Sequence, residues 1–118
     1  CALMTGRYLH KTGCHGGDIN NKNAWGVPIT ETFIPEFLHD AGYYNVMFGK
    51  WHLGVSSEDF LPNSRGFDHF QGFIGEGEDH YSHENGGQYD WYYNYDIDND
   101  YEGVYSAEAL NETIQTFI

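Results

Sequence analysis

Two segments of the chain repeat apolar residues at helical spacing. In residues 30–41 the apolar positions recur three and four residues apart, which is the pattern of an amphipathic helix. Pro35 is expected in the first turn, where its missing N–H costs nothing, and Gly42 is expected to stop the helix. Residues 106–118 predict a second amphipathic helix with Ser106 as N-cap. Its expected apolar side is formed by Ala107, Leu110, Ile114, Phe117 and Ile118.

Residues 43–48 (YYNVMF) predict a β-strand between these helices. The run is aromatic and β-branched and lies between two glycines, which is typical of a strand buried on at least one face. A helix, a one-residue glycine turn and a strand form half of an α/β repeat. Residues 1–4 are interpreted as the last turn of a helix that ends at Gly6. Residues 10–27 and 54–103, both rich in glycine, predict loops and short strands.

The net charge of the 118 residues is −13, and it is unevenly distributed. All five Lys and Arg residues lie at or before position 65, whereas residues 66–118 carry 12 of the 18 acidic residues. Nucleic acid is therefore excluded as a partner, because binding to phosphates needs a basic patch, and an anionic membrane surface is disfavoured for the same reason. The many aromatic residues exclude a disordered acidic tail. No apolar run is long enough to predict a membrane-spanning helix.

The cysteines and the acidic residues predict no metal site within the chain. Cys1 and Cys14 are too few for a disulfide framework, and we interpret them as free or separately paired thiols. The alternating acids of residues 96–102 fail the EF-hand pattern in both registers, so they predict a solvated acidic loop. His80 and His83 have the spacing of zinc ligands on a helix, but no helix is predicted there. Asn111 begins a glycosylation sequon that would accept a glycan in a secreted protein.

Residues 49–54 (GKWHLG), directly after the predicted strand, hold the best candidate for a reactive site. Ligands of open α/β sheets bind outside the carboxyl ends of the strands. Lys50 and His52 would project there, with the lysine holding an anion and the histidine exchanging protons near neutral pH. By position alone, a surface lysine and a hydrogen-bonded histidine explain the pattern equally well.

Four segments in the correct order resemble the sulfatase family. Residues 1–8 (CALMTGRY) resemble the downstream half of the first sulfatase signature. Residues 42–54 (GYYNVMFGKWHLG) resemble the second, commonly G-Y-x-T-x-x-x-G-K-W-H-L-G, with Asn45 and Phe48 as departures that lie in the strand. Residues 61–73 (LPNSRGFDHFQGF) are similar to the family's L-P-x-x-R-G-F-D-x-F-x-G-F stretch. Residues 78–84 (EDHYSHE) resemble the E-D-Y-Y-S-H-E segment of the arylsulfatase B, I and J group.

The resemblance implies an α/β fold, a sandwich of the alkaline-phosphatase-like type around a large mixed sheet. It implies that residues 1–118 are part of the N-terminal catalytic domain of a larger sulfuric ester hydrolase, so we expect them to expose apolar faces. The expected substrates are sulfated small molecules or glycans such as N-acetylgalactosamine 4-sulfate, and the expected location is lysosomal or extracellular. By carry-over, Lys50 would bind a sulfate oxygen and His52 would assist the reaction. Ser82 and His83 would line the substrate side, and Arg7 would order the helix end.

The same resemblance implies that the nucleophile and the calcium ligands lie outside this chain. Sulfatases use a formylglycine, which a formylglycine-generating enzyme makes from the Cys or Ser of C-x-P-S-R. In register that residue would lie five positions before Cys1, and neither Cys1 nor Cys14 is followed by the required Pro and Arg. One alternative is an inactive secreted relative that kept the fold as a binding protein. A phosphatase or phosphodiesterase of the same superfamily is disfavoured, because the two signatures are not those of such enzymes.

Overall fold

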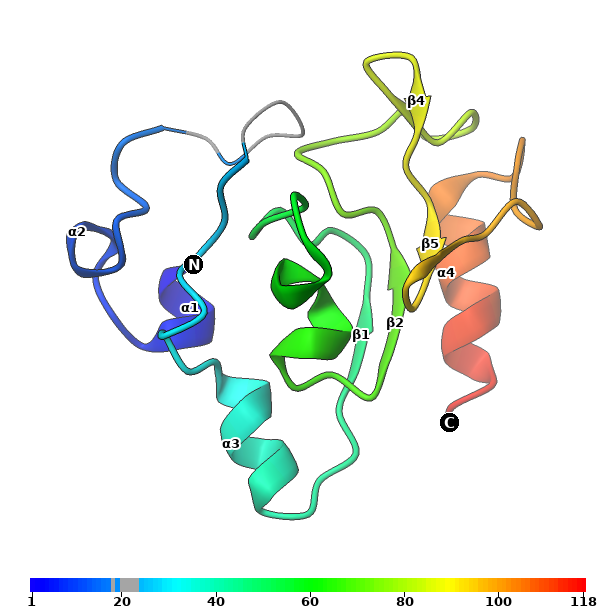
Figure 1. Cartoon of the computed structure of the whole chain (residues 1–118). Helices are drawn as coiled ribbons and strands as arrows, with labels where there is room; N and C mark the ends of the chain where they lie inside the picture. Colours follow the sequence, from blue (N-terminus) through cyan, green and yellow to red (C-terminus); the bar gives the residue numbers. More distant parts are fainter. Residues whose placement is uncertain (18, 20–23) are drawn as a thin grey trace.

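Figure 1 shows a computed structural model, which describes residues 1–17, 19 and 24–118. The helices are α1 (Ala2–Thr5), α2 (Leu9–Thr12), α3 (Ile34–Asp40) and α4 (Ser106–Gln115), and the 3-10 helices are η1 (Glu58–Phe60) and η2 (Pro62–Arg65). The strands are β1 (Val46–Phe48), β2 (His69–Gly72), β3 (Glu84–Asn85), β4 (Gln88–Tyr89), β5 (Tyr92–Tyr93) and β6 (Asp96–Ile97).

The main sheet has the strand order β1-β2-β5-β6 and mixes two pairing directions. β1 runs parallel to β2, with Val46 opposite His69, whereas β2, β5 and β6 pair antiparallel. β3 and β4 form a separate two-stranded hairpin. In Figure 1, α4 lies beside the sheet on the right, and α1, α2 and α3 lie on the left. The predicted fold class, a mixed α/β arrangement, is confirmed.

Aromatic side chains fill the contacts on both faces of the sheet. On the α4 face, the ring of His69 lies 4.5 Å from that of Phe117 and 5.5 Å from that of Phe48, measured between centroids. The other face is covered by a core of buried apolar residues: Ile19, Val27, Phe33, Trp51, Leu53, Leu61, Phe70 and Ile74. The segment after β1 is therefore part of the core as well as a candidate site.

Arg65, the arginine of the LPNSRGFD stretch, is a buried structural cation. Its guanidinium lies 3.7 Å from the ring centroid of Phe33, a cation–π contact. It donates hydrogen bonds to the backbone oxygens of Val27 at 3.3 Å and of Glu31 at 2.5 Å. A buried charge needs such partners to offset its lost hydration. Through them, Arg65 connects η2 to the segment that leads into α3.

The elements near the predicted strand agree with the sequence pattern, but they are shorter. α1 ends at Gly6, which has the left-handed φ of 65° that suits glycine at this position. α3 begins four residues later than the start of the predicted segment, with Pro35 in its first turn, and it ends before Gly42. β1 begins only at Val46, and the backbone N–H of Asn45 donates to the carboxylate of Asp68 at 2.7 Å rather than to a neighbouring strand. The side chain of Asn45 donates to the backbone oxygens of Pro35 and Gly66 at 2.8 and 2.9 Å.

Two expectations about the remaining helices were wrong. The predicted loop of residues 10–27 contains most of the short helix α2, and the part of that prediction on residues 18 and 20–23 lies outside the described residues. In α4 the N-cap is Tyr105, and Ser106 is the first helical residue, whose hydroxyl donates to Glu78 at 2.6 Å. Ala107 is exposed, whereas Ala109 and Thr113 are buried, so the packed face is rotated from the predicted one.

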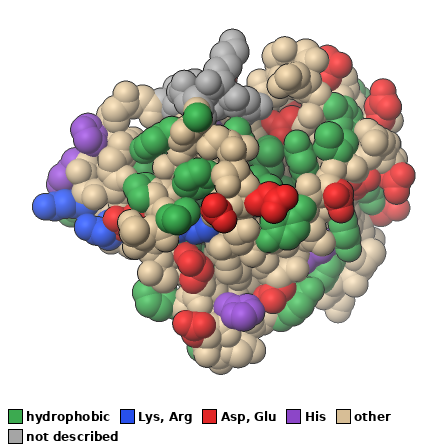
Figure 2. Space-filling model, viewed as in Figure 1, with side chains coloured by type: hydrophobic (Ala, Val, Ile, Leu, Met, Phe, Trp, Pro, Cys, Tyr) green, Lys and Arg blue, Asp and Glu red, His purple; other side chains and the backbone are tan. Residues whose placement is uncertain are grey.

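The expectation of exposed apolar surface is confirmed by large side chains on α1, α3 and the approach to β1. Among them are Leu3, Phe37, Tyr43 and Tyr44, each more than 60% exposed. Figure 2 shows Lys and Arg side chains toward the left of this face and many Asp and Glu side chains toward the right. None of the helices in the described ranges is long and apolar enough to span a membrane.

Candidate active site

Residues 49–52 extend the parallel pairing of β1 with β2. The backbone N–H groups of Gly49, Trp51 and His52 donate to the oxygens of Gln71, Phe73 and Ile74 at 2.9, 3.0 and 3.1 Å. These are hydrogen bonds of ordinary sheet length. The backbone of the candidate segment is therefore held by hydrogen bonds to β2 and to the residues that follow it, and it does not form a free loop.

The close approach of the two strands depends on a glycine. Gly72 has a φ of 147°, in the region that favours glycine, and a Cβ there would collide with the backbone of Gly49. The strand that supports the site can therefore approach Gly49 only because residue 72 has no side chain. This requirement could not be seen from the sequence, where Gly72 is one of 15 glycines.

Lys50 and His52 are both anchored on residues 74–76. The ammonium of exposed Lys50 donates to the backbone oxygen of Glu76, and the N–H of His52 donates to Ile74. His52 has a left-handed φ of 56°, a conformation that is uncommon for a residue with a side chain. Its Nε2 is buried and has no hydrogen-bond partner among the residues that the structure describes. Residues 74–76 thus hold both the ammonium of Lys50, which has further N–H groups to donate, and the backbone of His52, whose ring nitrogen Nε2 is available.

Asp90 holds this support in place. Its two carboxylate oxygens accept the N–H groups of Ile74 and Gly75, each at 2.9 Å, and the residue is only 3% exposed. In the sequence Asp90 lies near the start of an acidic run, residues 89–102. No signal in the sequence marks it, because Asp96 of the same run also lies between two apolar residues and is exposed.

Residues 96–102 were predicted to form a solvated acidic loop, but not all of their acidic side chains are exposed. Asp98 is half-buried and accepts a hydrogen bond from the side chain of Gln71 at 2.9 Å. Its backbone oxygen accepts the hydroxyl of Tyr89 at 2.8 Å, and burial raises the pKa of that tyrosine to about 12. The remaining acids of residues 96–102 include exposed Asp96 and Asp100, for which the solvated interpretation holds.

Trp51, between the two candidate residues, fixes their spacing. It is 4% exposed, and its indole N–H is shared between the oxygens of Phe60 at 2.9 Å and Gly54 at 3.2 Å. Its ring also packs edge-on against Phe67 at 6.1 Å. Burial of the tryptophan therefore locks the backbone from which Lys50 and His52 project.

Ser82 and His83 lie in a separate turn, where the described residues show no hydrogen bond from either one to Lys50 or His52. Exposed Ser82 donates its N–H to the carboxylate of Asp79 at 2.9 Å, and this bond lowers the pKa of Asp79. His83 is fully buried, with Nδ1 2.8 Å from the carboxylate of Glu78 and Nε2 3.0 Å from the oxygen of Tyr101. Substrate contact stays a prediction for both residues. The exposure of Ser82 is compatible with such a contact, whereas the ring of His83 is fully buried.

Arg7 and Asn111 are the other residues that the sequence singled out. Arg7 donates to both carboxylate oxygens of Glu31 at 2.7 Å, which connects the end of α1 to the segment before α3. This contact is compatible with the predicted role in ordering the helix end. Asn111 is exposed on α4, whereas the hydroxyl of Thr113 is buried and donates to Ala109 at 3.1 Å.

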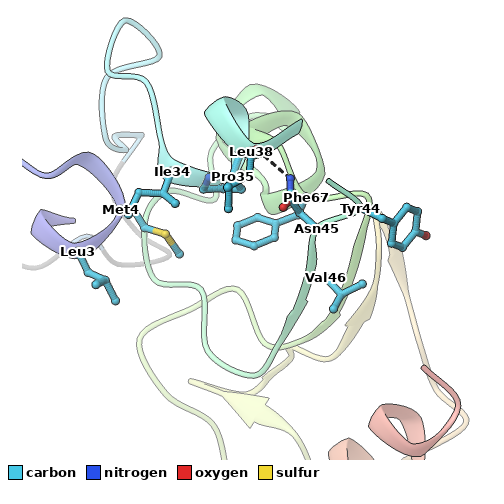
Figure 3. A pocket seen from close by; sticks show the side chains of 9 residues that line it. All are labelled: Leu3, Met4, Ile34, Pro35, Leu38, Tyr44, Asn45, Val46 and Phe67. Carbon is cyan, nitrogen blue, oxygen red and sulfur yellow. Dashed lines mark hydrogen bonds between the residues drawn. The ribbon is translucent and has the colours of Figure 1, made fainter. Parts of the chain in front are cut away.

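An apolar groove lies between α1, α3 and β1 (Figure 3). It is lined by Leu3, Met4, Ile34, Pro35, Leu38, Tyr44, Asn45, Val46 and Phe67. The dashed line in the figure marks the hydrogen bond from Asn45 to Pro35, which joins two walls of the groove. Neither Lys50 nor His52 lines it, so the groove is distinct from the candidate chemistry.

The residues that support the site do not fit a calcium ion. Calcium needs several oxygen ligands, carboxylates among them. Both carboxylate oxygens of Asp90 are already occupied by backbone N–H groups. Within residues 1–17, 19 and 24–118, no group of three or more Asp, Glu, His or Cys residues could hold a metal ion.

Comparison with known proteins identifies the family of the chain. The profile of the sulfatase family matches residues 1–118. Arylsulfatase J of Mus musculus is 33% identical over 122 residues, which cover 98% of this chain and 20% of that protein. Arylsulfatase A of Homo sapiens is 40% identical over 86 residues, which cover 72% of this chain and 16% of that protein. The chain therefore belongs to the sulfatase family, and it spans about a fifth of the length of these curated relatives.

A solved structure supports the same assignment at the level of the fold. The crystal structure of Ps i-CgsB superposes with a TM-score of 0.85 and 30% sequence identity over 98% of this chain and 29% of that chain. The same protein has been solved in complex with k-i-k-neocarrahexaose, with a TM-score of 0.84 to this chain. The predicted alkaline-phosphatase-like α/β fold is confirmed.

Proposed function

We propose that the whole protein hydrolyses sulfate esters and that Lys50 and His52 form one wall of its active site. The observation that carries this proposal is the shared anchoring of the two residues on residues 74–76, with the Nε2 of His52 buried and without a hydrogen-bond partner in the described part of the chain. Membership of the sulfatase family supports the reaction class.

The proposed chemistry follows from the charges of the reaction. When a nucleophile attacks sulfur, a new S–O bond forms, the S–O bond to the alcohol breaks, and the leaving oxygen gains negative charge. A fixed cation stabilises this transition state because it needs no reorganisation during the reaction. Lys50 would bind a sulfuryl oxygen through the N–H groups it does not donate to Glu76. His52 would hold a proton at Nε2 for exchange with a reacting oxygen.

The nucleophile and the metal are proposed to come from outside these 118 residues. We propose a formylglycine, produced by a formylglycine-generating enzyme, and Ca²⁺, both as the family resemblance implies. No step above depends on them, because the residues described here supply neither.

The proposed substrate class is a sulfated glycan, with N-acetylgalactosamine 4-sulfate as the specific ester to examine first. The complex of Ps i-CgsB with an oligosaccharide supports a glycan as the ligand of this fold. We also propose that the protein is lysosomal or extracellular, where the exposed Asn111 could carry a glycan.

The test is hydrolysis by the full-length protein of 4-nitrophenyl sulfate, with 4-nitrophenyl phosphate as the matched substrate. We expect release of 4-nitrophenol from the sulfate at a much higher kcat/KM than from the phosphate. Hydrolysis of the phosphate alone would assign a phosphatase. Binding of sulfated glycans by a folded protein that hydrolyses neither ester would assign an inactive relative.

A further inference from the structure

We propose that Cys1 and Cys14 form a disulfide bond that connects the start of α1 to the segment after α2. The two sulfur atoms lie 2.7 Å apart, which is shorter than the van der Waals contact of two sulfurs. Both side chains are half-buried, and 13 residues separate them along the chain. The sequence alone did not indicate this pairing, since two cysteines at that spacing match no framework or metal motif.

The surroundings of the two sulfurs favour their approach to each other. The hydroxyl of Thr12 donates to the backbone oxygen of Leu9 at 3.1 Å, so its hydrogen is used. Its oxygen lies 3.2 Å from the sulfur of Cys1 and therefore accepts from that thiol. Cys14 in turn donates to the sulfur of Cys1. In the reduced form the thiols are thus already aligned in a chain of hydrogen bonds, with one cysteine sulfur directed at the other.

The local fold brings the two cysteines together through two glycine-ended turns. α1 stops at Gly6, and α2 stops at Gly13, whose left-handed φ of 80° turns the chain directly before Cys14. A disulfide bond requires the two sulfurs to approach to about 2.05 Å, and the Sγ atoms of this pair are already 2.7 Å apart. A covalent bond would then close the loop that contains α1, Arg7 and α2.

Oxidation requires an acceptor, and we assign this role to a disulfide of an oxidoreductase or of a small thiol. A thiolate of one cysteine attacks the acceptor's S–S bond, which forms a mixed disulfide and releases one thiol. The second cysteine then attacks the mixed disulfide, which forms the Cys1–Cys14 bond and releases the second thiol. The pair loses two electrons and two protons, and the acceptor gains them.

The disulfide bond would stabilise α1 more strongly than does the ion pair of Arg7 with Glu31, which also holds this helix. The end of α1 is held to the segment before α3 by the ion pair of Arg7 with Glu31, and that pair is exposed on the arginine side. Exposed ion pairs add little stability. A short disulfide loop reduces the entropy of the unfolded chain and is the stronger constraint. This inference does not rest on the proposed sulfatase activity, because it concerns the covalent state of the chain alone.

The test is peptide mapping of the full-length protein exported to an oxidising compartment and purified without reductant. Free thiols are alkylated under denaturing conditions, the protein is digested, and the peptides are analysed by mass spectrometry before and after reduction. We expect one linked peptide pair that contains Cys1 and Cys14, and neither cysteine alkylated before reduction. Alkylation of both cysteines in the unreduced sample, or a bond from either one to another cysteine, would overturn the proposal.

Thermal unfolding provides an independent measurement. We expect Cys14→Ser to lower the Tm by about 2 °C or more relative to the oxidised protein. Cys1→Ser should lower it equally, and the double variant should fall no further, because either substitution removes the same bond. Reductant should lower the Tm of the wild type to that of the variants and leave the variants unchanged. Equal sensitivity of wild type and variants to reductant would contradict the bond.

Discussion

The carboxylate of Asp90 accepts the backbone N–H of Ile74 at 2.9 Å, and the oxygen of Ile74 accepts the N–H of His52 at 3.1 Å. Buried Asp90, from the C-terminal half of the chain, is thus connected through one residue, Ile74, to His52, the residue proposed to exchange a proton. Ile74, two residues after the end of β2, is the physical connection, because its N–H and its carbonyl oxygen form the two hydrogen bonds.

Replacement of Asp90 by Asn should therefore lower activity through position rather than through chemistry. The amide keeps one acceptor oxygen but presents an NH₂ group to the second backbone N–H. Loss of a buried hydrogen bond to a charged group costs about 2 kcal/mol of folding free energy. We expect kcat/KM of the folded D90N enzyme to fall at least tenfold, measured well below its Tm.

Asp98→Asn is the matched control for that variant. Asp98 lies in the same acidic run but accepts from the side chain of Gln71 rather than from the support of the site. We expect D98N to lose stability with little change in kcat/KM. If the two variants lose equal activity at equal distance from their Tm, Asp90 has no special role in positioning.

Lys50→Ala in the full-length protein should lower kcat/KM about 100-fold or more, the usual scale for removal of one preorganised charged partner. Lys50 is exposed, and within residues 1–17, 19 and 24–118 its ammonium donates only to the Glu76 backbone oxygen, so folding should be unaffected. Lys11→Ala, which removes an exposed lysine of α2, is the control. Steady-state kinetics on an aryl sulfate measures both, and a loss below tenfold for a folded K50A enzyme would remove Lys50 from the site.

His52→Asn tests the ring and the backbone separately. Asparagine tolerates the left-handed φ of 56° found here, so this variant keeps the turn while removing the imidazole. We expect kcat to fall by about 10²- to 10⁴-fold, the range for loss of a general acid or base, with the Tm nearly unchanged. A pH profile of kcat that is identical in shape for wild type and H52N would show that His52 does not exchange a proton in the reaction.

The sequence predicted the elements that local signals determine. The glycine end of α1, Pro35 in the first turn of α3 and a strand before the GKWHLG segment all follow from residues next to one another. The exact extent of β1 did not follow, because the backbone N–H of Asn45 donates to the carboxylate of Asp68, which is 23 residues away. The same holds for α4, whose first residue Ser106 is directed at Glu78 rather than at its own helix.

The candidate site was predictable where chemistry lies in one short motif. Lys50 and His52 are predicted from their types, their place after a strand and the resemblance of residues 42–54 to the second sulfatase signature, and their roles stay predictions. Asp90 and Gly72 were not found, because their roles arise only when the second strand pairs with residues 49–52. His83 illustrates the opposite case: the resemblance of residues 78–84 to a family segment implies substrate contact, but the ring is enclosed by Glu78, Tyr101 and Trp91.

Gly72→Ala should disturb both stability and the site. The added Cβ would collide with the backbone of Gly49, and alanine would be strained at a φ of 147°. We expect a loss of about 2 kcal/mol or more in the free energy of unfolding, with lower kcat/KM in the folded fraction. Gly77→Ala is the control, because a Cβ at that position meets no atom within 4 Å. Urea denaturation of both variants gives the comparison, and equal stability would refute the close-approach argument.

The pH dependence of stability should carry a contribution from His69. Burial lowers the pKa of His69 below its usual 6.5. Its ring packs against those of Phe48, Tyr93 and Phe117, and its buried Nε2 has no hydrogen-bond partner among the described residues. Above pH 6.5 the histidine is neutral in both the folded and the unfolded chain, so its contribution to stability is fully present. As the pH falls through 6.5 toward the lower folded pKa, the unfolded chain takes up a proton that the folded chain does not, and stability decreases.

Replacement of His69 by Phe keeps an aromatic ring and removes the titration. We expect the free energy of unfolding of H69F to fall less steeply than that of the wild type as the pH is lowered below 6.5. Urea unfolding from pH 8 downward measures this, and the difference between the two proteins at pH 8 serves as the reference for packing alone. A difference that stays constant at every pH would mean that His69 takes up its proton equally in the folded and the unfolded chain, against the effect of its burial.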